Sequence, residues 1–447
     1  MNKQNAIAVF DIGKTNKKLL LFNEDYDVVF ERSLQFDEIK DEDGFPCEDV
    51  AALTEWIKKS VDNVLTLKDV EIKAINFSAY GASFVHIDEN GKPVAPLYNY
   101  LKPFPEELQK KFYADYGGEI NFSKITASPV LGNLNSGLQL YRLKYERPGI
   151  FNRINSSLHL PQYVSSILTG EKYSDITSIG CHTALWDFTQ KKYHEWVYKE
   201  NIANKLAEIS ACNHIEKIEV QNKILQIGIG MHDSSSALVP YLLNFKEPFV
   251  LLSTGTWNIS LNPFNEHPLT AEELQNDCLC YLTHDNKPVK ASRLFAGYEY
   301  ELQVKRIAAH FNQQAEKYFS LPFDINLIEK NQKKDSHDLK IFSQRDLNEF
   351  ADDVQVYYQL INDLINAQVF STNLILNDKV SSVFVDGGFS KNSIFMHCLA
   401  LAFPKQKIYA ASVAQASALG AAMVIHDQWN KKNIPGNVIH LQHYPSN

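Results

Sequence analysis

Residues 8–22 read AVFDIGKTNKKLLLF, and this stretch decides the fold. Two apolar runs flank a short polar turn that holds one acid, Asp11, one glycine, Gly13, and several small or basic residues. Apolar runs joined by so short a turn predict a β-hairpin, with strands over residues 6–12 and 17–23. Hairpin turns and phosphate-binding turns use the same small residues, so this stretch alone leaves both interpretations open.

The same pattern returns at residues 249–261, which read FVLLSTGTWNISL. Periodic strand and helix patterns follow each of the two hairpins. Those after the first hairpin are an extended stretch near 26–32, a helix over 50–64, a strand over 71–78 and helices over 134–146, 159–169 and 233–242. Those after the second are a helical stretch over 347–374, a strand over 383–385 and helices over 392–402 and 413–427.

We therefore expect an α/β chain in which one domain architecture occurs twice. The N-terminal domain spans residues 1–242 and the C-terminal domain spans 243–430, each beginning with its hairpin. The tail, residues 431–447, lies outside the repeat. A chain of 447 residues is too long for one compact core, which agrees with at least two domains.

The composition limits the partners and the compartment. A net charge of −9 and the lack of a lysine or arginine block argue against a nucleic-acid or anionic-membrane partner. No apolar run reaches the roughly 18 residues of a membrane span, and Asp11 interrupts the first run before a signal peptide could form. We expect a cytoplasmic protein that binds small molecules as a monomer or a homodimer.

Six cysteines in a chain of this length do not make a disulfide framework. Cys278 and Cys280 lack the spacing of a zinc knuckle, and no second cysteine pair accompanies them. We expect all six to be reduced thiols.

Both hairpin turns have the composition of a phosphate site. Gly13 and Gly255 let backbone amides approach an anion closely, and the threonine, serine and asparagine side chains around them add donors. Asp11 carries the same sign of charge as a phosphate, so its place in the turn fits if a hydrated Mg²⁺ lies between the two. Two such turns, each at the start of a domain, favour a nucleotide held between two lobes.

Two further segments place unusual residues at a strand end and a helix start. Residues 384–392, FVDGGFSKN, contain Gly387 and Gly388, which would let a flat adenine or ribose lie against the backbone. Residues 228–237, GIGMHDSSSA, begin like a dinucleotide-binding fingerprint, but Asp233 stands at its third glycine position, so we reject that interpretation. An acid at a helix start caps the helix or faces a cleft, and both roles can coexist.

These four segments, in this order and spacing, resemble the FGGY carbohydrate kinases, which are sugar kinases of the actin-like ATPase fold. DIGKTNKK (11–18) is similar to that family's first phosphate motif, LLSTGTWNISL (251–261) to its second and VFVDGGFSKN (383–392) to its adenosine motif. The resemblance covers roughly residues 6–425. It implies a two-domain actin-like ATPase (ribonuclease H-like) fold with duplicated mixed β-sheet domains and an interdomain cleft.

The resemblance also implies a role for each matching residue. Asp233 would be the catalytic base for a sugar hydroxyl, and Asp11 would help to hold Mg²⁺. Lys14 is unusual in this motif, and it either contacts a phosphate or is solvated. The residues that would bind ATP are Gly13, Lys14, Thr15, Asn16, Thr254, Gly255, Thr256, Gly387, Gly388 and Asn392. The residues that would bind the sugar are Tyr80, Gly81, Ala82, Ser83, His232 and Asp233.

The sugar segment is similar in style to the rhamnulose and fuculose kinases of that family. Residues 78–84, SAYGASF, look like their aromatic and glycine segment, with Ser83 where they carry an acid. The Asp-x-Arg of the pentulose and glycerol kinases is missing from residues 98–103, YNYLKP. The resemblance implies an ATP- and Mg²⁺-dependent ketose kinase, with a 6-deoxyhexulose such as L-rhamnulose or L-fuculose favoured and a pentulose second.

Two other classes of function stay open at this stage. An actin-like ATPase that drives a protein partner would share the hairpin motifs, although GIGMHDSSSA fits a sugar site better. A non-catalytic sugar-binding regulator has no need of both Asp11 and Asp233, but the residues at Lys14 and Ser83 keep it open. Sugar-dependent release of ADP separates the three classes.

Overall fold

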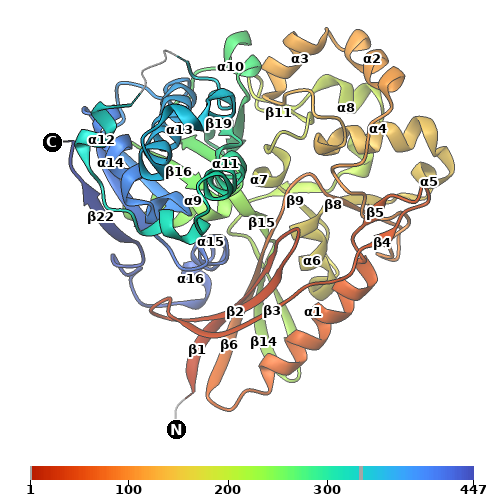
Figure 1. The fold of residues 1–447 in the computed structure, drawn as a ribbon. Coiled ribbons are helices and arrows are strands. Elements are labelled where there is room, and N and C mark those ends of the chain that lie inside the picture. Colours follow the sequence, from red (N-terminus) through yellow and green to blue (C-terminus); the bar gives the residue numbers. More distant parts are fainter. Residues whose placement is uncertain (1–2, 332–335, 447) are drawn as a thin grey trace.

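The structure is a computed structural model that describes residues 3–331 and 336–446. Two seven-stranded β-sheets form its core, with helices packed on their faces (Figure 1). The strands of the N-terminal sheet are β1 (Gln4–Ile12), β2 (Lys17–Asn23), β3 (Val28–Leu34), β6 (Val70–Ala79), β13 (Ile215–Val220), β14 (Lys223–Gly228) and β15 (Met231–His232). Those of the C-terminal sheet are β16 (Phe249–Thr254), β17 (Asn258–Asn262), β18 (Cys278–Leu282), β19 (Pro288–Leu294), β20 (Ser382–Gly387), β21 (Lys407–Ser412) and β22 (His440–Tyr444).

Short strand pairs and helices complete the described part of the chain. The pairs are β4 (Ile39–Lys40) with β5 (Pro46–Cys47), β7 (Phe84–Ile87) with β8 (Ser156–His159), β9 (Tyr173–Asp175) with β12 (Glu208–Ser210), and β10 (Trp186–Asp187) with β11 (Lys192–Tyr193). The helices before the second sheet are α1 (Val50–Leu65), α2 (Glu106–Asp115), α3 (Glu119–Thr126), α4 (Ser136–Glu146), α5 (Pro148–Arg153), α6 (Leu160–Thr169), α7 (Ile176–Ile179), α8 (Glu195–Lys199) and α9 (Asp233–Asn244). The later helices are α10 (Ala271–Gln275), α11 (Ala296–His310), α12 (Ile325–Glu329), α13 (Asp353–Asn373), α14 (Ser393–Ala402), α15 (Ala416–Val424) and α16 (His426–Trp429).

The two predicted hairpins are confirmed, and the sheets around them repeat one arrangement. β1 pairs antiparallel with β2 and parallel with β6, while β16 pairs antiparallel with β17 and parallel with β20. Both faces of β1 are apolar and buried from Ala6 to Phe10 because helices cover the sheet on both sides. In each half, therefore, the turn of the hairpin and the carboxyl end of the parallel strand meet at one edge of the sheet.

Capping residues fix the helix boundaries. Asp352 caps α13 by accepting a hydrogen bond from the amide of Gln355. The helical stretch expected from residue 347 therefore starts later, and residues 347–349 form a separate 3₁₀ turn. Gly170 ends α6 in the left-handed conformation, with φ of 74°. The single helix expected over 413–427 is two helices, α15 and α16.

We expected the tail, residues 431–447, to lie outside the repeated architecture. Instead, it contributes a strand to the second sheet. Its strand β22 pairs antiparallel with β21, and Tyr444 packs into the core of that half. Only Tyr444 of the five residues HLQHY is buried, so the segment lacks the regular alternation of apolar and polar residues that predicts a strand. The pairing covers backbone groups of β21 that would otherwise form an open sheet edge.

Helices α9 and α15 lie between the two sheets and pack closely on each other (Figure 1). Val239 of α9 and Leu419 of α15 pack against β1 and β2. Tyr241 of the same α9 packs against Phe249 and Phe384 of the second sheet. Because α9 contacts both sheets, its first residue, Asp233, has a fixed place relative to both halves of the molecule.

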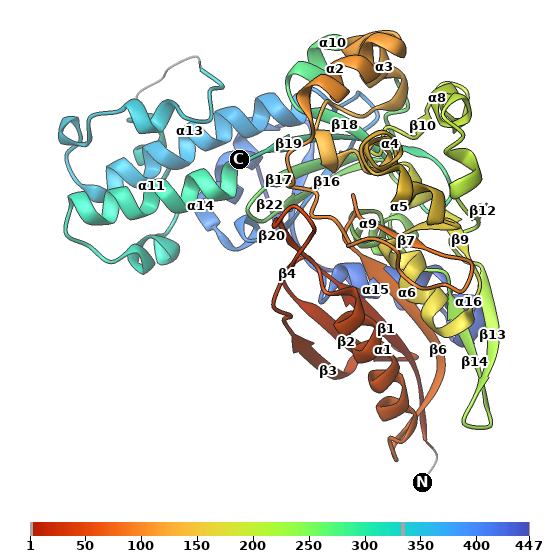
Figure 2. The same ribbon diagram turned by 90° about the vertical axis from the view of Figure 1, so that its right-hand side faces the viewer.

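A separate helical lobe extends from the first sheet. It contains α2, α3, α4, α5 and α8, and Figure 2 shows it on the opposite side of the molecule from α11 and α13. Its core is aromatic, with Phe112, Tyr141 and Trp196 in edge-to-face contact. The lobe packs on the strand pair β7–β8, which directly follows the predicted sugar segment.

In the described part of the chain, no helix has the length and hydropathy to cross a membrane. All six cysteines are free and buried, as expected for reduced thiols.

We predict that Gly420→Ala strongly destabilises the protein. A Cβ on Gly420 would lie 1.8 Å from the carbonyl oxygen of Ser236, so α15 would have to move away from α9. The expected loss is about 2–4 kcal/mol of unfolding free energy, measured by urea denaturation. Gly149→Ala in α5 is the control, since no atom lies within 4 Å of its added Cβ. Equal stability of the two variants would contradict this account of the helix contact.

Candidate active site

A cavity of about 390 Å³ lies where the ends of β1 and α9 meet the second sheet. Its wall contains both carboxylates that the sequence analysis predicted to be functional, Asp11 and Asp233. The other lining residues are Lys18, Ser234, Ala237, Leu251, Ser253, Ile259, Leu261, Asp386, Gln415, Ala416 and Ser417. The cavity is thus acidic, with one lysine in its wall, and it is built from both halves of the chain.

Asp11 sits in surroundings that disfavour its negative charge. Burial raises the pKa of Asp11 to about 6, and the neighbouring carboxylate of Asp233 contributes to the increase. A hydrogen bond from the hydroxyl of Ser417, 2.9 Å from Oδ2, and the charge of Lys18 act in the opposite direction. A cation next to Asp11 would remove this cost, which fits the predicted Mg²⁺ ligand.

Asp233 is the first residue of α9 and does not cap it. The N-cap residue is His232, and no side chain makes the capping hydrogen bond. Instead, Oδ1 of Asp233 accepts from the amide of Ser234 at 2.6 Å and lies 3.3 Å from Nε2 of His232. Oδ2 has no partner among the described residues, and the side chain is 34% exposed. One carboxylate oxygen is therefore oriented by the protein and the other is available to a ligand.

His232 supports this arrangement from a buried position. Its Nε2 also lies 3.2 Å from Sγ of Cys181, and its ring stacks on Tyr281 of the second sheet. Burial lowers the pKa of His232, so the ring is neutral at pH 7. The predicted sugar residue His232 thus contacts the predicted base, Asp233, directly.

The two hairpin turns are closed in a similar way. The amide of Gly13 donates to the carbonyl of Asn16, and the amide of Gly255 donates to the carbonyl of Trp257, both at 2.9 Å. The amides of Gly13 and Gly255 are therefore both used within their own turns. In the part of the chain that the structure describes, the amides of Lys14, Thr15 and Thr256 have no acceptor. The donors available to a phosphate are therefore these following amides.

The lysines after the first turn point in different directions. Lys14 forms an ion pair with Glu38 at 2.6 Å, so its ammonium is neither free nor in the wall of the acidic cavity. Lys17 is buried in an ion pair with Glu48 at 2.5 Å. Lys18, which the motif analysis did not single out, lies in the cavity wall opposite Asp11 in the strand register.

A second cavity, of about 520 Å³, lies beside the second hairpin turn. Four of the predicted nucleotide residues line it, namely Gly255, Thr256, Gly388 and Asn392. The remaining lining residues, which the sequence did not point to, are Gly297, Tyr300, Glu301, Phe319, Phe389 and Lys391. Aromatic side chains beside a glycine-lined wall suit a flat base.

Two other predicted nucleotide residues, Thr254 and Gly387, do not line this cavity but directly precede Gly255 and Gly388, which do. The hydroxyl of Thr254 donates to the carbonyl of Asp386 at 2.6 Å and accepts from the amide of Phe389. Gly387 has φ of 94°, and a Cβ there would lie 1.9 Å from the carbonyl oxygen of Thr254. The side chain of Asn392 caps α14. Gly13, Thr15 and Asn16 line neither of the two cavities.

The predicted sugar segment forms a tight turn against His232. A Cβ on Gly81 would lie 2.7 Å from Nε2 of His232, so the backbone of the segment touches the ring. The hydroxyl of Tyr80 donates to Glu48 at 3.2 Å. The hydroxyl of Ser83 is buried and donates to the carbonyl of Gly81 at 3.1 Å. Ser83 therefore stabilises the turn, in place of the acid that was expected there by resemblance.

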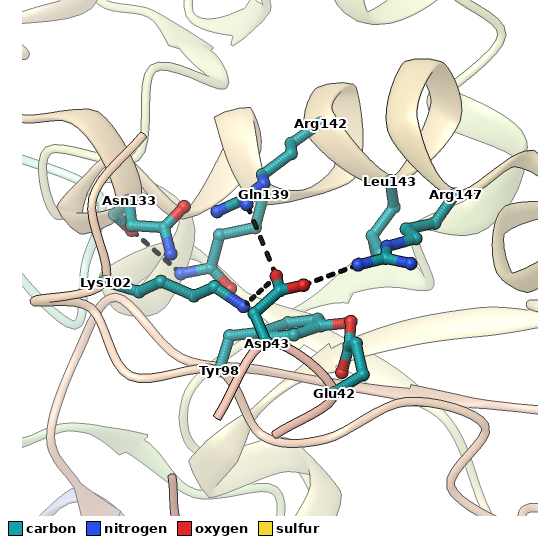
Figure 3. Close-up of a pocket in the computed structure, with 9 residues that line it drawn as sticks. All are labelled: Glu42, Asp43, Tyr98, Lys102, Asn133, Gln139, Arg142, Leu143 and Arg147. Atoms are coloured by element: carbon teal, nitrogen blue, oxygen red, sulfur yellow. Dashed lines mark hydrogen bonds and ion pairs between the residues drawn. The ribbon is translucent and has the colours of Figure 1, made fainter. Parts of the chain in front are cut away.

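A charged cluster lies behind this segment, between the β4–β5 hairpin and α4 (Figure 3). Lys102 is bound to Asp41 at 2.5 Å and to Asp43 at 2.7 Å, and Arg147 binds Asp43 at 2.6 Å. Arg142 is bound to Glu146. Every cation of the cluster thus has a carboxylate partner within the chain, which makes the cluster part of the scaffold.

Comparison with known proteins identifies the family. The model described as the FGGY family of carbohydrate kinases, N-terminal domain, matches residues 6–226. The model described as carbohydrate kinase FGGY, C-terminal domain, matches residues 246–322. The two matches together cover more than half of the chain, and the chain belongs to the FGGY family of carbohydrate kinases.

Particular relatives share less of the sequence. Two curated proteins named rhamnulokinase, from Mannheimia succiniciproducens and Halalkalibacterium halodurans, are each 23% identical to this chain, over 263 and 271 residues. Each match covers 57% of this chain and 52% or 55% of the relative, so the chain spans about half the length of the curated relatives that it matches. The crystal structure of a carbohydrate kinase from Novosphingobium aromaticivorans is 20% identical, has a TM-score of 0.81 and matches over 100% of this chain and 95% of that one. The predicted two-domain actin-like fold is confirmed.

We predict that Asp11→Asn stabilises the protein at pH 8. Because the pKa of Asp11 is raised from 3.8 to about 6 in the folded state, its ionisation lowers the stability progressively as the pH rises from about 4 to about 6, and the full cost is present above pH 6. The neutral amide should therefore raise the unfolding free energy by about 1–3 kcal/mol at pH 8 and by much less at pH 4. Thermal unfolding at both pH values measures the effect. Asp37→Asn, at an exposed position, should change neither value, and an unchanged stability of Asp11→Asn at pH 8 would contradict the proposed environment.

Proposed function

We propose that this protein is an ATP-dependent sugar kinase that transfers the γ-phosphoryl group of ATP to a hydroxyl of a ketose. The observation that carries the proposal is Oδ2 of Asp233, a carboxylate oxygen without an intrachain partner in the described residues, facing a cavity that also contains Asp11. A separate cavity lined by Gly255, Thr256 and Gly388 lies beside it and suits a nucleotide. A base, a cation ligand and a nucleotide pocket are the parts that phosphoryl transfer to an alcohol requires.

Each group has a definite task in this proposal. The adenosine of ATP occupies the cavity beside Gly388, and its phosphates extend toward the two hairpin turns. The amides of Lys14, Thr15 and Thr256 donate to the phosphate oxygens, and the ammonium of Lys18 offsets their charge. Oδ2 of Asp233 accepts the proton of the attacking hydroxyl, while Ser234 and His232 hold Oδ1.

The residues fit a magnesium ion bound with the nucleotide. No cluster of three or more histidine, cysteine, aspartate or glutamate side chains that could hold a metal occurs in the described part of the chain. Asp11, whose buried carboxylate lies in the wall of the cavity, would hold the ion on the protein side, and the phosphates of the nucleotide would bind it as well. When bound, Mg²⁺ supplies positive charge that stabilises the transferring phosphoryl group.

We propose a 6-deoxyhexulose as the acceptor, with L-rhamnulose tested first. The two curated relatives named rhamnulokinase support this choice, as do the neighbouring His232 and Asp233. A pentulose is the second choice.

Purified protein with Mg-ATP and a panel of ketoses and polyols tests the proposal through release of ADP. One ketose should stimulate turnover, and Asp233→Ala should reduce kcat by about 10²–10⁴-fold because the general base is lost. ATP binding, measured by calorimetry, should be unchanged in the variant. Turnover that is independent of sugar, or that survives in Asp233→Ala, would contradict the proposed function.

A further inference from the structure

The acceptor segment contains a strained residue. Ala82 has φ of 58°, in the left-handed region that residues with a Cβ seldom adopt. Its side chain is buried, so it is not held there by solvent or by a flexible loop end. Strain of this kind persists only where surrounding contacts enforce it, and it often marks a functional site.

Gln139 of α4 contacts the backbone of this residue directly. Nε2 of Gln139 donates to the carbonyl of Ala82 at 2.9 Å and to the carbonyl of Asn133 at 2.8 Å. Gln139 is 1% exposed, so no water competes for these two hydrogen bonds. The carbonyl oxygen of its amide has no partner among the described residues, so the nitrogen alone fixes the orientation of the side chain.

The position of Gln139 is itself rigid. It lies in the wall of the small cavity drawn in Figure 3, beside Asn133 and the buried ammonium of Lys102. The ion pairs of Lys102 tie the loop before α2 to the β4–β5 hairpin, and the side chain of Asn133 donates to the carbonyl of Asn99 in that loop. Gln139 is therefore linked through Asn133 to the loop that the ion pairs of Lys102 hold in place.

The other end of the segment is held as well. The hydroxyl of Tyr80 donates to Glu48, whose second oxygen is bound to Lys17 at 2.5 Å. Lys17 begins β2, directly after the first hairpin turn. The segment is therefore fixed at Tyr80 by the phosphate turn and at Ala82 by Gln139, with Gly81 pressed against His232 between them.

We propose that Gln139 is a positioning residue that sets the affinity for the acceptor sugar by holding Ala82 in its left-handed conformation. This inference rests on the proposed function, because it takes residues 80–83 as the acceptor segment. Gln139 acts on the segment and not on the nucleotide, since the nucleotide cavity is lined by residues from Gly255 onward. Substitution of Gln139 should therefore change the KM for the sugar and leave the KM for ATP nearly unchanged.

The test is Gln139→Met, which keeps the volume of the side chain and removes both donors. The KM for the ketose that gives turnover with the natural protein should rise by about tenfold, the effect of losing one buried hydrogen bond. The KM for ATP should stay within about twofold. Hydrogen exchange of the amides of residues 81–84 should become faster in the variant, and this measurement requires no substrate.

Gln368→Met is the matched control. Gln368 is also 1% exposed and donates two hydrogen bonds through Nε2, to Ser260 and Thr372, but in the second half of the chain. A comparable loss of stability with an unchanged ketose KM is expected for it. A rise in ketose KM equal to that of Gln139→Met would overturn the proposal, because the effect would then reflect general destabilisation.

A second variant tests the mechanism even where Gln139→Met is poorly stable. Adding Ala82→Gly should recover about fivefold of the lost ketose affinity, since glycine adopts the left-handed conformation without strain. No recovery, together with unchanged hydrogen exchange at residues 81–84, would overturn the proposal. If the natural protein turns over no sugar, the proposed function fails, and hydrogen exchange alone then decides whether Gln139 holds the segment.

Discussion

The structure depends on an electrostatic constraint at the junction of its two halves. Asp11 and Asp233 share a cavity of about 390 Å³ with one lysine in its wall. Burial raises the pKa of Asp11 to about 6, and the charge of Asp233 adds to the increase. A cation beside Asp11 would favour the ionised form of its carboxyl group. The fold maintains the arrangement because α9 contacts both sheets and packs against α15 at Gly420. The ionised form of Asp11 therefore costs free energy in this site, and a metal ion bound with the nucleotide would reduce that cost.

Duplication of the hairpin gives the two halves related but unequal parts. Each turn is closed by the amide of its glycine, Gly13 or Gly255, and leaves the next amides free in the described chain. The first half adds the predicted base and the predicted sugar segment, and the second adds the cavity with aromatic residues in its wall that we propose for the nucleotide. Phosphoryl transfer needs mainly alignment of the two ligands and neutralisation of charge. A site that holds one ligand in each half of the chain would supply this alignment.

Much of the fold could be predicted from local sequence signals. The features that depend on contacts between distant segments could not. The two hairpins and the end of the helix at residue 169 depend on nearby residues alone, and the sequence analysis predicted both. Lys17 and Lys18 look equivalent in the sequence, yet strand alternation buries one with Glu48 and places the other in the acidic cavity. Gln139 carries no motif, because its role depends on a carbonyl 57 residues away. The edge strand β22 was missed because its pairing, not its pattern, defines it.

Phosphorus NMR of the complete reaction mixture tests the central claim most directly. With Mg-ATP and the ketose that stimulates turnover, the γ-phosphate signal should be replaced by a sugar phosphomonoester in the same amount as ADP. Asp233→Ala should form both products about 10²–10⁴-fold more slowly. Coupling of that phosphorus to the sugar protons would identify the hydroxyl that is phosphorylated. Formation of inorganic phosphate in place of the ester would contradict a sugar kinase and would favour an ATPase that acts through a protein partner.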